Sequence, residues 1–264
     1  MKKRLTYPLL QMALLLVVLS GCATTGKIAQ IKQRGVLLVG STGDYRPLSY
    51  LEPSSRQYWG FDAEIAAIIG NQLGVEIQYV PTSWPTLTED MLGGKLFDIA
   101  ICGISVTAER QKTMLMTEGY LHNGKTILCR KDDASRFQSL SDIDRPEVVV
   151  MVNPGGLNEK FANESLKKAR IVVHERNEEI PTLVAEGKAD IMITEIVEAP
   201  YYVQSDARLA APLIEQPFTS GMIGALMRKG DEDLLKMVNK VIERIKRDGT
   251  LKQLHDKYGF KYSF

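Results

Sequence analysis

The sequence predicts an α/β fold of two lobes with a ligand cleft between them. Apolar runs of strand length alternate with amphipathic stretches of helical length, which is the β-α-β rhythm of a parallel sheet. This rhythm begins a second time near Lys125, so the chain contains two such units. Polar segments follow the predicted strands, and open α/β sheets bind ligands at the carboxyl ends of their strands.

The first unit starts with an apolar strand and continues through an amphipathic helix that ends at a glycine. Gly74 marks this end because glycine readily adopts the left-handed conformation found at helix C-termini. We expect strands at residues 35–40, 75–80 and 97–102 and helices at residues 61–73 and 86–92.

The second unit repeats the rhythm with runs rich in valine and isoleucine. We expect strands at residues 126–130, 148–152, 171–173 and 190–193, with helices after Asn158 and Glu178. The C-terminal tail then returns through a strand at residues 224–227 to an amphipathic helix at residues 231–248, which Gly249 stops.

The N-terminus indicates export from the cytoplasm. Lys2, Lys3 and Arg4 precede an apolar core at residues 12–19, which is too short to span a membrane and has the charge order of a secretory signal. The core ends in Leu-Ser-Gly-Cys22, which resembles a bacterial lipobox. We therefore expect residues 1–22 to be a lipoprotein signal peptide, Cys22 to carry the lipid that anchors the protein to a membrane, and residues 23–30 to be a tether. A plain signal peptide with a chance cysteine is the alternative.

The composition favours a compact domain of the cell envelope, periplasmic or extracytoplasmic. The chain has 44% hydrophobic residues and a formal net charge of +1, so no net field attracts nucleic acid. Cys102 and Cys129 lie in apolar runs and are expected as buried thiols, with a disulfide between them left open. The three histidines stand singly, so we expect neither a metal site nor a catalytic triad based on histidine.

The segment at residues 153–161, Asn-Pro-Gly-Gly-Leu-Asn-Glu-Lys-Phe, predicts an anion-binding loop after a buried strand. Its glycines let backbone N–H groups approach a ligand, and Asn158 is expected to cap a helix whose positive end faces the same space. The loop suits a carboxylate, because it lacks the Lys-Ser/Thr ending of a nucleotide P-loop. An ordinary strand-to-helix turn is the alternative.

Three further polar segments are expected to open onto the same cleft. Ser105 and Arg110 together offer a hydroxyl and a planar set of donors, which is the chemistry that binds a carboxylate. Tyr45 and Trp84 offer flat apolar walls. The alternatives are core packing for Trp84 and a surface salt bridge with Glu109 or Glu118 for Arg110.

Four segments, at residues 41–45, 60–62, 105–110 and 187–190, resemble the extracellular solute-binding proteins that deliver polar amino acids to ABC transporters. The resemblance implies a periplasmic-binding-protein type II fold, with lobe 1 formed by residues 31–123 plus 220–264 and lobe 2 by residues 124–219. It implies that Arg110 holds the α-carboxylate of the ligand and that Glu195 holds its amine, at a place where aspartate is usual. Asp44, Gly103 and Leu157 join the expected binding residues.

Further segments, at residues 81–85, 124–126, 136–138, 153–161 and 166–171, look like those of the periplasmic cyclohexadienyl dehydratases, enzymes descended from the binding proteins. These enzymes convert prephenate to phenylpyruvate and arogenate to phenylalanine, with loss of carbon dioxide and of the ring hydroxyl. The resemblance implies that Glu198 is the general acid and that Asn153, Asn158 and Lys125 orient it or bind the second carboxylate of the substrate.

Hydroxide is a poor leaving group, so an acid must protonate the departing hydroxyl. We expect Thr194 to cap a helix that begins near Glu195, which would place Glu195 and Glu198 on one helix face. The positive helix end would lower the pKa of Glu198, so burial or nearby negative charge must raise it. A solvated acid in the first turn of a helix is the alternative.

Two hypotheses of different class therefore stand. The first is a lipid-anchored cyclohexadienyl dehydratase that acts on prephenate and arogenate without a cofactor. The second is an amino-acid-binding lipoprotein that delivers a polar or cationic amino acid to an ABC permease, with Glu198 facing a cationic side chain. Thr107 and the segment at residues 216–223 are closer to a plain binding protein than to the dehydratases.

Overall fold

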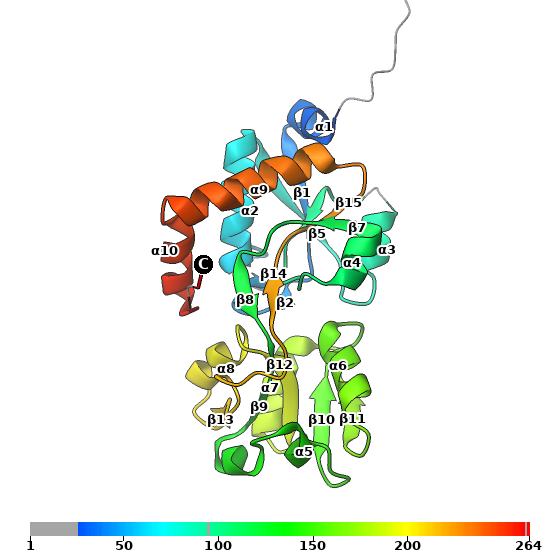
Figure 1. Ribbon diagram of the computed structural model, residues 1–264, viewed down its shortest axis with the longest axis vertical. Helices are drawn as coiled ribbons and strands as arrows, with labels where there is room; N and C mark the ends of the chain where they lie inside the picture. Colours follow the sequence, from blue (N-terminus) through cyan, green and yellow to red (C-terminus); the bar gives the residue numbers. More distant parts are fainter. Residues whose placement is uncertain (1–25, 94–95, 262) are drawn as a thin grey trace, which may run out of the picture.

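The structure, a computed structural model, describes residues 26–93, 96–261 and 263–264. It has two α/β lobes, one above the other in Figure 1, as the sequence predicts. The expected signal peptide and Cys22 lie outside the described residues. Within the described ranges, no helix is both long and apolar enough to cross a membrane.

The first lobe is built on a five-stranded sheet with the order β5-β1-β6-β15-β7. Its parallel strands are β1 (Val36–Ser41), β5 (Glu76–Pro81) and β6 (Ile99–Ala100), and its antiparallel strands are β7 (Met114–Met116) and β15 (Leu226–Arg228). The predicted strands at residues 35–40 and 75–80 are confirmed within one residue. The third predicted strand is shorter than expected, because the chain leaves the sheet toward Gly103, where φ is +79°.

Helices of the first lobe pack on this sheet with apolar faces of helical period. The buried residues Ile65, Ile69 and Leu73 form one such face, and Gly74 ends that helix at φ +71° as predicted. The helices are α1 (Lys27–Arg34), α2 (Phe61–Leu73), α3 (Leu87–Leu92), α4 (Ala108–Thr113), α9 (Glu232–Arg247) and α10 (Thr250–Tyr258). Since α9 and α10 come from the C-terminal tail, the tail completes the first lobe (Figure 1).

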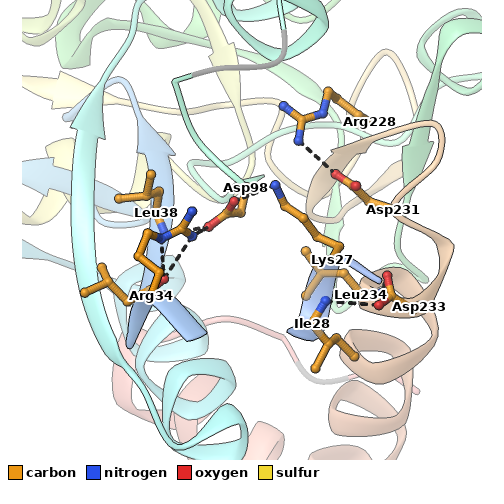
Figure 2. Close-up of polar contacts among 10 residues, drawn as sticks. Lys27, Ile28, Arg34, Leu38, Asp98, Arg228, Asp231, Asp233 and Leu234 are labelled. Carbon is orange, nitrogen blue, oxygen red and sulfur yellow. Dashed lines mark hydrogen bonds and ion pairs between the residues drawn. The ribbon is translucent and has the colours of Figure 1, made fainter. Parts of the chain in front are cut away.

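Helix α1 shows that the expected tether at residues 23–30 is too long. Its first residue, Lys27, is 9% exposed and its Nζ lies 2.7 Å from Asp98 Oδ1. Asp98 also accepts hydrogen bonds from Arg34 and from the backbone N–H of Leu38 (Figure 2). Asp233 accepts the N–H of Ile28 at 3.0 Å (Figure 2). A buried lysine with a paired carboxylate is a fixed contact, so the chain is attached to lobe 1 from Lys27 onward.

The second lobe has a five-stranded sheet with the order β11-β10-β12-β9-β13. Its strands are β9 (Lys125–Arg130), β10 (Val149–Val152), β11 (Arg170–Val173), β12 (Ile191–Glu195) and β13 (Leu209–Ala210), and its helices are η1 (Lys131–Arg136), α5 (Leu140–Ile143), α6 (Leu157–Ser165), η2 (Asn177–Glu179), α7 (Ile180–Ala185) and α8 (Ala199–Ser205). The four strands predicted here are all present, with ends shifted by at most two residues. β10, β11 and β12 are parallel, and β9 pairs antiparallel with β12.

Two antiparallel strands, β8 (Leu121–Asn123) and β14 (Gly221–Ile223), run side by side between the lobes (Figure 1). A small sheet of β2 (Asp44–Tyr45), β3 (Ser49–Leu51) and β4 (Tyr58–Trp59) belongs to the first lobe. Strands of two or three residues carry too little alternation to be predicted. Cys102 and Cys129 are buried free thiols in different apolar cores, as expected for unpaired cysteines.

Candidate functional site

One cavity between the lobes collects nearly all of the residues that the sequence analysis selected. It is lined by Tyr45, Trp84, Gly103, Ser105, Arg110, Lys125, Asn153, Gly156, Leu157, Asn158, Asn177, Glu195 and Glu198. Of the selected residues within the described ranges, Asp44 alone does not line it. The segments come together because the carboxyl ends of parallel strands in each lobe face the space between the sheets.

Lobe 1 supplies an aromatic wall. The rings of Tyr45 and Trp84 meet edge to face, with centroids 6.0 Å apart. Trp84 is half-buried, and its Nε1 donates to Asp44 Oδ1 at 3.1 Å. Asp44 therefore lies behind the aromatic wall and orients the indole of Trp84. Burial raises the pKa of the Asp44 carboxyl. Trp84 both packs against the apolar core and faces the cavity.

Arg110 is a cation without a carboxylate partner among the described residues. It lies in the first turn of α4, which Thr107 caps by accepting the N–H of Arg110 at 3.2 Å. Its Nη1 donates to the backbone oxygen of Ser105 at 2.8 Å. The alternative of a salt bridge with Glu109 does not hold, because Glu109 pairs with Lys160 of lobe 2 at 2.5 Å. Arg110 is thus oriented by the chain and keeps donors for an anion.

Lys125, Glu195 and Asn158 form a buried polar cluster on the floor of the cavity. Strands β9 and β12 place Lys125 opposite Glu195, and Lys125 Nζ lies 2.5 Å from Glu195 Oε1 and 2.6 Å from Asn158 Oδ1. The other oxygen of Glu195, Oε2, accepts a hydrogen bond from the hydroxyl of Tyr45. Burial opposes ionisation of Glu195, but the charge and hydrogen bond of Lys125, with further hydrogen bonds from Tyr45 and Asn123, outweigh it and hold the pKa of Glu195 below its usual range. Glu195 is therefore an ionised, internally paired carboxylate.

Glu198 lies three residues further along and has a different environment. Its side chain is fully buried, with Thr194 Oγ1 donating to Oε2 at 2.5 Å and Asn177 Nδ2 donating to Oε1 at 3.1 Å. Burial, reinforced by the negative charges of Glu195 and Asp44, raises the pKa of Glu198 to about 8. The two donated hydrogen bonds lower this pKa but do not offset burial. The alternative of a solvated acid in a first helical turn is wrong.

The helix expected to start near Glu195 starts at Ala199 instead. Glu195 stays in strand β12 because it pairs with Lys125, and residues 195–198 form a turn in which the N–H of Glu198 donates to the oxygen of Glu195 at 3.0 Å. Thr194 does not cap a helix, since its hydroxyl binds the carboxylate of Glu198. The two glutamates thus share a turn and not a helix face.

The glycine-rich loop at residues 153–156 closes the cavity from lobe 2. Gly155 has φ +73°, and a Cβ there would lie 2.6 Å from the backbone of Pro85 in lobe 1, so only glycine fits. Asn158 does not cap α6, because the helix begins one residue earlier with Gly156 at its N-terminus. Its side chain lines the cavity, where Oδ1 accepts a hydrogen bond from Lys125 Nζ. Asn153 is 5% exposed beside Gly156.

Asn177 is the site residue that the sequence analysis missed. It lies at the start of η2, shortly after β11, and is 3% exposed. The rule that polar residues follow strand ends would have selected it, because β11 is one of the predicted parallel strands. Across the described part of the chain, no group of three or more His, Cys, Asp and Glu side chains is arranged to hold a metal ion.

Comparison with known proteins identifies bacterial solute-binding proteins and cyclohexadienyl dehydratases as relatives of this chain. The family model of the bacterial extracellular solute-binding proteins, family 3, matches residues 37–261. The cyclohexadienyl dehydratase of Pseudomonas aeruginosa is 39% identical over 231 residues, which cover 88% of this chain and 85% of that protein. A crystal structure of an ancestral amino-acid-binding protein, a precursor of cyclohexadienyl dehydratase, is 36% identical with a TM-score of 0.81 and covers 89% of this chain and 100% of its own. A crystal structure of an ancestral cyclohexadienyl dehydratase is 49% identical with a TM-score of 0.54, over 88% of this chain and 96% of its own.

Proposed function

Because the chain belongs to the bacterial extracellular solute-binding proteins, family 3, and its cleft contains a buried acid with a raised pKa, we propose that it is a cyclohexadienyl dehydratase. The proposed reactions convert prephenate to phenylpyruvate and arogenate to phenylalanine. Glu198 carries the proposal, because a carboxyl with a pKa of about 8 is mostly protonated at neutral pH and can act as a general acid. The relatives include both dehydratases and amino-acid-binding proteins, so the fold alone does not decide between them.

In the proposed step the bond between the ring and its carboxylate breaks, and carbon dioxide leaves. The electron pair of that bond moves into the ring, which becomes aromatic as the bond to the hydroxyl breaks. Glu198 gives its proton to the departing hydroxyl, so water leaves and Glu198 becomes a carboxylate. A proton from solvent restores the acid, and one proton is consumed in each turnover of prephenate.

The charges of the cleft fit a substrate with two carboxylates. Arg110, together with Ser105 of the same cavity lining, is the proposed partner of the side-chain carboxylate, because no carboxylate of the described residues pairs with its guanidinium. Lys125, Asn153 and Asn158 are the proposed partners of the ring carboxylate. The aromatic wall of Tyr45 and Trp84 fits a six-membered ring. Closure of the lobes around the substrate would exclude water from the acid.

The test is turnover of prephenate and arogenate by the purified protein without residues 1–22, measured by chromatography of phenylpyruvate and phenylalanine. Glu198→Gln keeps the size of the side chain and removes its proton, so we expect kcat to fall by roughly 10²- to 10⁴-fold. Glu186→Gln, an exposed change in the same lobe, is the matched control and should keep full activity. Full activity of the Glu198→Gln protein would exclude Glu198 as the acid.

An amino-acid receptor of an ABC transporter is the second candidate. Arg110, which no described carboxylate neutralises, favours any ligand with an α-carboxylate, and the ancestral relative with a TM-score of 0.81 is an amino-acid-binding protein. In that case Glu198 would face a cationic side chain, and an ABC permease would be the partner. A parent protein with no turnover, whose melting temperature rises with arginine or lysine, would establish this candidate.

The chain belongs to an extracellular family, so its location is extracytoplasmic. We propose that Cys22 is lipidated and holds the protein to a membrane, which the Leu-Ser-Gly-Cys sequence supports. We also propose that residues 31–123 plus 220–264 and residues 124–219 move as separate lobes, with β8 and β14 as the connections between them. Incorporation of labelled fatty acid into the parent and its loss in Cys22→Ala would test the anchor.

A further inference from the structure

Asn177 connects the proposed acid to the opposite lobe. Its Nδ2 donates to Glu198 Oε1 at 3.1 Å and to the backbone oxygen of Asp44 at 3.2 Å. Glu198 and Asn177 belong to the second sheet and its helices, whereas Asp44 lies in strand β2 of lobe 1. One buried amide nitrogen therefore holds both contacts, and one of them crosses the cleft.

The two contacts determine the orientation of the amide. Nδ2 carries two hydrogens, and each has an acceptor, whereas a reversed amide would turn its oxygen toward two other oxygens. Because the side chain is rigid and planar at this end, the hydrogen bond to Asp44 directs the second hydrogen toward Glu198. If lobe 1 moves away, Asp44 moves with it, and the amide loses the contact that orients it.

The same contacts restrict where the neutral acid can carry its proton. Oε1 of Glu198 already accepts a hydrogen bond from an amide hydrogen of Asn177. A proton on Oε1 would therefore lie close to that hydrogen and be repelled by it. Oε2 lies 2.5 Å from Thr194 Oγ1, and this hydroxyl can donate a hydrogen bond to the carboxylate or rotate to accept one from a protonated Oε2. The proton of neutral Glu198 is therefore placed on Oε2.

We propose that Asn177 is a positioning residue that holds Glu198 with its proton on Oε2, and that it does so only while lobe 1 supplies the carbonyl of Asp44. This inference rests on the proposed dehydratase function and adds a link between lobe closure and the acid. The titratable groups that face Glu198 are Glu195, Asp44, Tyr45 and Tyr202. Within the described ranges, the hydrogen bonds to the Glu198 carboxylate come from Thr194 and Asn177.

The test compares Asn177→Leu with the parent, because leucine has a similar size and no donor. Its matched control is Asn163→Leu, an exposed change in the same lobe. Loss of a hydrogen bond to the charged form raises the pKa of an acid, so we expect the alkaline limb of the kcat profile to move up by about one pH unit. We expect kcat at neutral pH to fall about tenfold and KM to change less than about threefold, because the acid is misplaced while the carboxylate partners remain.

A second readout needs no turnover. The infrared carbonyl band of protonated Glu198, identified by its loss in Glu198→Gln, is titrated in both proteins with and without phenylpyruvate. We expect the pKa of Glu198 to be higher in Asn177→Leu than in the parent. This difference should be larger with phenylpyruvate, when the lobes are together. An equal shift in both states would overturn the dependence on lobe 1.

The outcomes separate the inference from the function. An active parent whose Asn177→Leu variant keeps the kcat, the pH profile and the infrared titration of the parent would overturn the role of Asn177. A parent without turnover would overturn the dehydratase instead, and the infrared titration would still decide whether Asn177 controls the proton of Glu198. Circular dichroism of both variants checks that the fold is retained.

Discussion

Glu195 and Glu198 are two buried glutamates three residues apart, and the protein gives them opposite protonation states. Glu195 is 5% exposed and Glu198 is fully buried, so burial disfavours the charged form of both. The pKa of Glu195 is nevertheless lowered, whereas that of Glu198 is raised to about 8. The difference is a cation, since Lys125 Nζ lies 2.5 Å from Glu195, whereas the donors to Glu198 among the described residues are neutral.

The comparison shows how one turn can hold a permanent charge and an acid. Neutral hydrogen bonds from Thr194 and Asn177 do not offset the burial of Glu198, while the ammonium group of Lys125, aided by neutral donors, offsets that of Glu195. The ionised Glu195 in turn disfavours ionisation of Glu198 through repulsion. Lys125 therefore acts on both carboxyls, directly on the first and through the first on the second.

The most severe way to break this arrangement is to remove the cation. Lys125→Met leaves Glu195 as a buried carboxylate without its partner, so we expect the free energy of unfolding at pH 7 to fall by roughly 3–5 kcal/mol. Urea denaturation followed by circular dichroism measures it. The exposed change Lys131→Met is the control and should stay within about 0.5 kcal/mol of the parent.

The double variant Lys125→Met/Glu195→Gln separates the pair from general damage. It removes both charges, so most of the lost stability should return. A double variant as unstable as Lys125→Met alone would show that Lys125 stabilises the protein by packing and not by pairing with Glu195.

Stability should also depend on pH in opposite ways at the two glutamates. The folded pKa of Glu198 is raised, so its contribution is fully present below the unfolded value of about 4.3 and is lost as pH rises toward 8. The folded pKa of Glu195 is lowered, so its contribution is present above the unfolded value and is lost as pH falls through the folded one. Between pH 5 and pH 8, therefore, Glu198 alone of the two should destabilise the protein as pH rises.

The measurement is the difference in unfolding free energy between Glu198→Gln and the parent at pH 5, 6, 7 and 8. We expect this difference to move in favour of the variant with rising pH, by up to about 4 kcal/mol over the three units. A difference that stays constant would mean that Glu198 is ionised in the folded protein throughout this range, and the contrast with Glu195 would fail.

Local sequence patterns predicted those parts of the fold that depend on local contacts. Helix α2 (Phe61–Leu73) and its end at Gly74 follow from periodicity and glycine conformation alone. Tyr45, Ser105 and Asn153 reached one cavity because each follows a predicted strand and strand ends share one edge of a sheet. The roles given to Glu195 and Glu198 came from the family resemblance, because spacing alone also allowed a solvated acid.

The errors arose where distant contacts decide local structure. Glu195 stays in β12 and not in a helix because it pairs with Lys125, 70 residues earlier in the chain. Asn177 binds groups that are 21 and 133 residues away, so its partners cannot be predicted from local spacing, although its place after β11 follows the rule for strand ends. Lys27 falls in the tether that the sequence predicts, but its partner Asp98 comes from the strand region of lobe 1 (Figure 2).

The mildest change asks whether the two carboxyls titrate independently. Tyr45→Phe removes the hydroxyl that donates to Glu195 but leaves Lys125 in place, so we expect a loss of about 1 kcal/mol in unfolding free energy at pH 7. Loss of this donor also raises the pKa of Glu195, so the acid-induced loss of stability should begin at a higher pH. Tyr79→Phe, whose hydroxyl forms no hydrogen bond within the described ranges, is the control.

The alkaline limb of the kcat profile should stay in place, because Glu195 remains ionised there and repels Glu198 as before. If that limb moves together with the acid transition, the two glutamates titrate as one coupled pair, and separate protonation states cannot be assigned to them.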